Sequence, residues 1–146
     1  MVRLEYRFAV TVAIVAYLAS FLMGLLFRFL MDYGLLSSIS TPPAIGMAQI
    51  VSVAIIGIIF AWIYFSFAKE APSLTDGLLL GALIALVGFA FDALLLVPLV
   101  IAGFPISIAL SIYAEPVFWG ALVALIVSTS TAGALLQRYP YLLGRA

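Results

Sequence analysis

Apolar residues form four long runs along the chain, separated by short polar or turn-rich segments. The runs cover residues 8–31, 44–68, 78–102 and 116–137. A membrane-spanning helix needs about 20 mainly apolar residues, and each run is long enough. The pattern predicts an all-α integral membrane protein, a four-transmembrane-helix bundle that forms a single domain over residues 1–146.

The start of the first run allows a second interpretation, a cleaved secretory signal. Arg3 and Arg7 precede the run, as basic residues precede the apolar part of a signal. Glu5 between them, the length of the run and the lack of a clean Ala-x-Ala site favour a retained helix.

Residues 104–115 do not fit any of the four runs. The segment is too short to cross a membrane, and joining it to the fourth run would give a helix too long for one crossing. We expect a short helix at the outer membrane surface, with a break at Glu115-Pro116 before the fourth span. A re-entrant half-helix is the alternative.

The basic residues predict the orientation. With the N-terminus in the cytoplasm, neither outer loop contains Lys or Arg, which satisfies the positive-inside rule. Aromatic residues near the ends of the runs are expected at the two membrane–water interfaces. These are Tyr6, Tyr139 and Tyr141 at the inner interface, and Tyr33, Tyr113 and Trp119 at the outer interface. We therefore expect a multi-pass protein of the cell membrane with both termini in the cytoplasm.

Composition supports a membrane protein and removes several classes of chemistry. The chain is 67% apolar and 8% charged, whereas soluble domains are about half apolar and a quarter charged. The net charge is zero and no basic patch exists, which argues against a nucleic-acid partner. With no Cys and no His, the chain has no disulfide, thiolate nucleophile, Cys/His zinc site, haem-ligating His or Ser-His-Asp triad. We expect no metal and no cofactor.

Small residues recur on one face of the third run and predict close helix packing. They follow one another at steps of four, four and three: Gly77, Gly81, Ala85 and Gly88. The fourth run has a similar row, which we expect to be the packing partner: Gly120, Ala124 and Ser128. Asp92 lies one turn after Gly88 on the same face, so its side chain is expected to point into protein.

Asp92 is the main candidate for function. It lies roughly 21 Å along the third span, in the outer half of the membrane. A charge there costs at least about 2.5 to 3.5 kcal/mol, so the residue must be paired, protonated or in contact with water. Arg28 can pair with Asp92 as a structural clamp, or with Asp32 one turn away on its own helix. We favour the clamp slightly, and both pairings stay open.

Other polar residues fall in the same outer layer as Asp92. Gln49, Ser52 and Glu115 join Asp92, Arg28 and Asp32 there, which suggests an outward-facing pocket. Glu115 precedes Pro116, where a helix cap explains it without any function. The hydroxyl residues at 128–131 lie in the inner half, and we expect them to bond the carbonyls of their own helix.

Three functional hypotheses follow. The first is a homo-oligomeric channel or transporter for protons, a small cation or a solute, in which Asp92 carries the proton or contacts the cation. The second is a non-catalytic accessory or assembly subunit of a larger membrane complex. The third, a lipid-directed membrane enzyme using Asp92 and Glu115 as acid and base, is the weakest. We favour the first, with the lipid bilayer and either further copies or a partner membrane subunit around the chain.

Overall fold

Every regular element in the described part of the chain is helical. The computed structural model describes residues 6–32, 42–68, 71–103 and 105–144. The α-helices are α1 (Tyr6–Asp32), α2 (Pro42–Phe67), α3 (Leu74–Ile101), α4 (Ile106–Ala114) and α5 (Pro116–Arg138), and a 3₁₀ helix, η1 (Pro140–Leu143), follows α5. The predicted all-α fold is confirmed over these residues.

Four of the described helices, α1, α2, α3 and α5, are long and apolar enough to cross a membrane. They coincide with the four predicted runs, and the largest difference is the start of α3, which lies at Leu74 instead of residue 78. The side of the membrane on which the termini lie stays a prediction.

The start of α3 is set by a cap. The backbone N–H of Asp76 donates to Oγ of Ser73 at 3.1 Å, and the Ser73 hydroxyl donates to Oδ2 of Asp76 at 2.5 Å. The first N–H groups of a helix lack partners within the helix, so a serine placed just before them is favourable. The cap extends α3 by about one turn before the apolar run.

The predicted short helix and the break after it are also present. After α3, Gly103 adopts a φ of +92°, a conformation that glycine accepts readily. Helix α4 follows, Glu115 is extended, and Pro116 begins α5, where its fixed φ suits the first turn. Whether α4 lies on a membrane surface remains a prediction.

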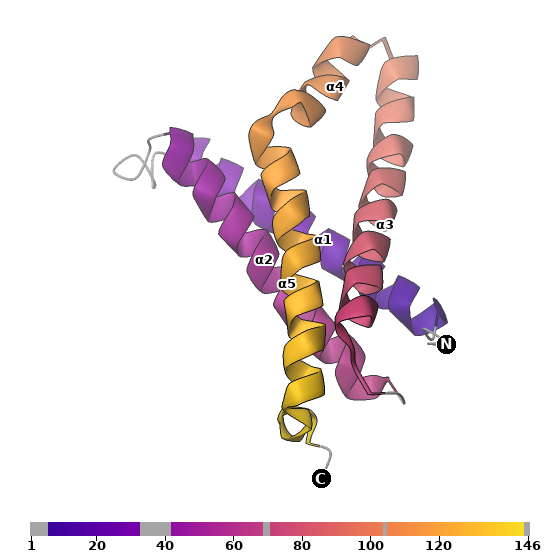
Figure 1. Cartoon of the computed structure of the whole chain (residues 1–146). Coiled ribbons are helices and arrows are strands. Elements are labelled where there is room, and N and C mark those ends of the chain that lie inside the picture. Colours follow the sequence, from indigo (N-terminus) through magenta and orange to yellow (C-terminus); the bar gives the residue numbers. More distant parts are fainter. Residues whose placement is uncertain (1–5, 33–41, 69–70, 104, 145–146) are drawn as a thin grey trace.

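The four long helices form a ring. Both α1 and α5 pack against α2 and against α3, so α1 and α5 occupy opposite corners. We call the end where α1 begins and α5 finishes the terminal end, and the opposite end the α4 end. Figure 1 shows the helices close together at the terminal end, while α2 and α3 lean apart toward the α4 end.

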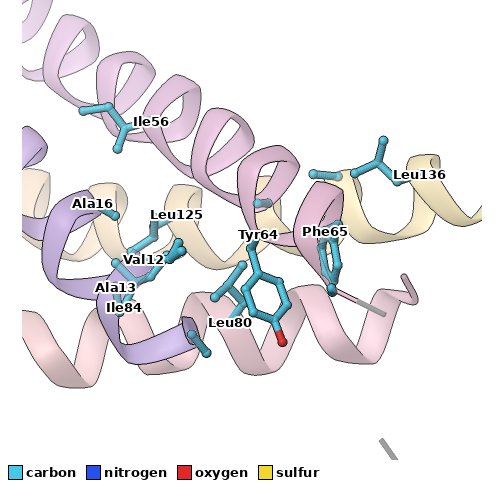
Figure 2. Close-up of a cluster of buried hydrophobic side chains, with 14 residues drawn as sticks. Val12, Ala13, Ala16, Ile56, Tyr64, Phe65, Leu80, Ile84, Leu125 and Leu136 are labelled. Atoms are coloured by element: carbon cyan, nitrogen blue, oxygen red, sulfur yellow. The ribbon is translucent and has the colours of Figure 1, made fainter. Parts of the chain in front are cut away.

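The hydrophobic core lies in the terminal half of this ring. It contains side chains from the first half of α1, the second half of α2, the first half of α3 and residues 125–136 of α5 (Figure 2). Phe65 and Leu80 are its largest fully buried apolar side chains. Small residues such as Ala9, Ala13 and Ala16 let α1 approach its neighbours closely. The opposite half of the ring is less tightly filled, and both cavities described below lie there.

Small residues bring α3 against α5, but not in the expected pairing. A Cβ at Gly77 would overlap the carbonyl oxygen of Thr129, and Gly133 on α5 faces the carbonyl of Ser73 in the same way. Gly120, expected to face α3, instead lies against Ile50 of α2. Ser128 likewise faces Gly57 of α2. The predicted partner row was therefore wrong, because Gly120 and Ser128 meet α2 and a different face of α5, which carries Thr129 and Gly133, meets α3.

Candidate functional site

Asp92 is held by two tyrosine hydroxyls from two other helices. Tyr17 of α1 donates to Oδ1 at 2.7 Å, and Tyr113 of α4 donates to Oδ2 at 3.1 Å. The Asp92 side chain is half-buried and each carboxyl oxygen accepts one of these bonds. Asp92 therefore points into protein, as the position of Gly88 predicted, and it joins α1, α3 and α4.

The ring of Tyr17 lies close to a glycine of α3. A Cβ at Gly88 would lie 3.3 Å from Cδ2 of Tyr17, so the ring packs closely on α3 one turn before Asp92. The same ring stacks on Phe91, with centroids 5.3 Å apart. This part of the small-residue face of α3 packs against α1, and it aligns the Tyr17 hydroxyl with the carboxyl group.

Tyr113 is held in a cluster of aromatic rings. Its ring stacks on Phe89 and meets Phe118 edge-on, and its backbone carbonyl accepts a 2.8 Å hydrogen bond from the indole N–H of Trp119. Burial, together with the neighbouring Asp92 carboxyl group, raises the pKa of the Tyr113 hydroxyl above its ordinary value of 10. The hydroxyl therefore stays protonated, and able to donate, at neutral pH.

A cavity of about 360 Å³ lies beside Asp92, between α1, α3 and α5. Asp92 is the acidic residue in its wall, and the other polar side chains there are those of Ser20 and Tyr17. Aromatic side chains cover much of the remainder: Phe21, Phe89 and Phe118. The cavity therefore combines one carboxyl group with an apolar, ring-rich surface.

A second cavity, of about 450 Å³, contains three other residues singled out from the sequence. Gln49, Ser52 and Glu115 all line it. It adjoins the first cavity, because α1, α2 and α5 contribute the same residues to both: Ser20, Gly24, Val53, Phe118 and Ala121. The sequence-predicted residues are thus divided between two neighbouring cavities, with Asp92 in one and Glu115 in the other.

Glu115 departs from its expected role. It is the N-cap residue of α5, but its side chain makes no capping hydrogen bond, and the backbone N–H of Phe118 bonds to the Glu115 carbonyl instead. The following proline has no N–H to offer a cap, which reduces the need for one. The exposed Glu115 carboxyl group is left on the wall of the second cavity.

The Arg28 clamp lies outside the described residues, because neither the side chain of Arg28 nor that of Asp32 is described. Both pairings of Arg28 stay predictions. The partners that the structure gives to Asp92 are Tyr17 and Tyr113, which the sequence did not single out. A signal for Tyr17 existed, since a tyrosine in the middle of an apolar run needs a partner for its hydroxyl.

The polar residues of the terminal half behave as structural groups. Ser128, Thr129, Ser130 and Thr131 all donate to carbonyls of α5, as predicted. Asp76 is 3% exposed, and its Oδ1 atom is buried without a hydrogen-bond partner. Within the described ranges, no group of three or more acidic residues is placed to hold a metal ion.

The chain was compared with known protein families, curated proteins and solved structures. No family model, curated protein or solved structure matches the chain. The Asp92 site and its cavity are therefore the basis of the functional proposal.

Proposed function

We propose that the chain is a multi-pass membrane protein that carries a proton or a small cationic solute by way of Asp92, as a channel or transporter. One observation carries this proposal. Asp92 is a half-buried acid on a span-length helix, held by two tyrosines on the wall of a cavity of about 360 Å³.

The energetic cost of an acid at this position supports a function for it. An ionised carboxylate inside a membrane is costly, by about 2.5 to 3.5 kcal/mol at the centre of a helix, and such residues commonly mark ion or proton paths. Two neutral tyrosine hydroxyls offset part of that cost but bring no positive charge. A cation that reaches the cavity would supply the missing charge.

The predicted orientation determines toward which side of the membrane the two cavities lie. If the terminal end faces the cytoplasm, as the basic residues favour, both cavities lie toward the outer surface. The well-packed core in the terminal half then closes the inner side. In this arrangement a solute enters from outside, and passage inward needs the terminal half to loosen or a path to form between copies.

An assembly of several copies fits the small size of the chain. Four helices enclose little volume, and a ring of copies adds paths between subunits. Large apolar side chains on every long helix are exposed, among them Leu22, Ile55, Leu86 and Val123. Lipid or neighbouring subunits would cover these side chains in a membrane.

Reconstitution into liposomes tests the proposal. Purified protein in sealed vesicles should dissipate an imposed gradient of H⁺ or of a small cation faster than empty vesicles do. The panel covers H⁺, Na⁺, K⁺ and a small organic ammonium ion. If no member of the panel moves faster than in empty vesicles, and a membrane partner co-purifies in fixed ratio, the subunit hypothesis replaces this one.

A further inference from the structure

We infer that the cavity beside Asp92 binds a primary ammonium group attached to a small apolar body. This inference rests on the proposed function and names the class of cation that the site takes. It depends on the free hydrogen-bonding capacity of the carboxyl group, on the surface of the cavity and on its size.

The carboxyl group of Asp92 has room for an ammonium ion. Each carboxylate oxygen offers about two acceptor sites, and each accepts one bond from a tyrosine, to Tyr17 at 2.7 Å and to Tyr113 at 3.1 Å. One acceptor site per oxygen is left for a ligand. The oxygen of Tyr17, which also lines the cavity, can itself accept a hydrogen bond. With the two carboxylate oxygens of Asp92, three oxygens are then available for the three N–H bonds of an ammonium group.

A metal ion suits this site less well. Calcium takes about six to eight oxygen ligands, and magnesium needs near-octahedral coordination. The first cavity offers Asp92 as its acid, and no cluster of three acidic residues occurs among the described residues. An ammonium ion needs only a few acceptors on one side, and the rest of the molecule can be apolar.

The surface opposite the carboxyl group suits an organic body. Phe21, Phe89 and Phe118 line the cavity together with Tyr17. Aromatic faces attract cations, and burying the apolar surface of a ligand favours its binding. A bare proton uses neither the rings nor the space. The volume, about 360 Å³, lies at the lower end of the range for small-molecule sites.

The test is direct binding to the full-length chain in lipid nanodiscs. The probe is 2-phenylethylammonium, and 2-phenylethanol serves as the uncharged analogue of nearly the same shape. Isothermal titration against protein-filled discs, corrected with empty discs, should show saturable binding of the amine. We expect the alcohol to bind at least about tenfold more weakly, because it cannot pair with the carboxylate.

Variants assign the binding to Asp92. Asp92→Asn should weaken amine binding at least about tenfold, while Glu115→Gln, which removes an acid from the neighbouring cavity, should have a smaller effect. Because Asp92→Asn can disturb folding, its helix content and elution volume are compared with those of the wild type. Phe118→Leu, which keeps the carboxyl group, should weaken binding of the amine and of the alcohol alike.

Three results would overturn this inference: equal binding of amine and alcohol, equal binding by wild type and a folded Asp92→Asn variant, or Asp92-dependent binding of Na⁺ or Ca²⁺ in place of the amine. The proposed function fails separately. If the vesicles pass protons but the discs bind no amine, only the ligand class is wrong. If the discs bind the amine but the vesicles pass no ion, the binding site is confirmed and the proposal of transport is wrong.

Discussion

The hydroxyl of Tyr17 donates a 2.7 Å hydrogen bond to Oδ1 of Asp92, and so joins α1 to α3 across 75 positions of sequence. The bond lies one turn beyond Gly88, where the tyrosine ring packs closely on α3. The contact therefore supports the helix packing and also holds the acid at the cavity wall.

Replacing Tyr17 tests how much its hydrogen bond to Asp92 contributes to the stability of the fold. Tyr17→Phe keeps the ring and its stacking on Phe91 but removes the donor. We expect a loss of about 1 to 2 kcal/mol in the free energy of unfolding, the range for a hydrogen bond between membrane helices or to a charged group. Unfolding in mixed detergent micelles, followed by circular dichroism, measures it. Tyr141→Phe, on an exposed residue of η1, is the matched control and should change little.

A double-mutant cycle isolates the pair. If Tyr17 and Asp92 interact, Tyr17→Phe combined with Asp92→Ala should cost less than the sum of the two single losses. Simple additivity would mean that the 2.7 Å contact contributes nothing to stability.

The contact between α3 and α5 predicts a strong glycine effect. Gly77→Ala places a methyl group against the Thr129 carbonyl, which belongs to rigid helix backbone, and should destabilise by about 1 to 3 kcal/mol. Gly24→Ala is the matched control, because nothing lies within 4 Å of the added Cβ and alanine favours a helix. Thermal unfolding in detergent compares the two. Equal stability of both variants would show that α3 and α5 do not pack closely.

The orientation can be measured with single cysteines, because the chain has none of its own. Ala71 before α3 and Ser107 in α4 are exposed, and they lie at opposite ends of the ring. With both termini in the cytoplasm, Ser107→Cys should react with an impermeant thiol reagent in intact cells, and Ala71→Cys should react only after lysis. The reverse pattern would invert the orientation and place the cavities toward the cytoplasm.

Much of the fold follows from local pattern alone. Apolar runs and turn residues predicted the four long helices, and the break at Glu115-Pro116 marked the start of α5. These features depend on residues close together in the chain. The pairing of helix faces does not, and Gly120 was assigned to α3 although it meets Ile50 of α2. Small residues show that a face packs closely, but not which helix covers it.

The site was predictable only in part, for a related reason. Asp92 stood out because a charge in an apolar helix is costly. Tyr17 lies within an apolar run, and Tyr113 was interpreted as a membrane-interface aromatic, so neither was predicted to be a partner of Asp92. Their roles depend on contacts between α1, α3 and α4. A short-range pattern carries no information about such contacts.

The central claim is that the carboxyl group at position 92 carries the transported charge, and a conservative series in liposomes tests it most directly. Wild type, Asp92→Glu and Asp92→Asn are reconstituted at equal density, after circular dichroism has shown equal helix content. The initial rate of H⁺ or ammonium uptake is then recorded. We predict that wild type is active, that Asp92→Glu keeps a measurable part of the rate, and that Asp92→Asn falls to the level of empty vesicles. Equal rates for wild type and a folded Asp92→Asn variant would contradict the claim.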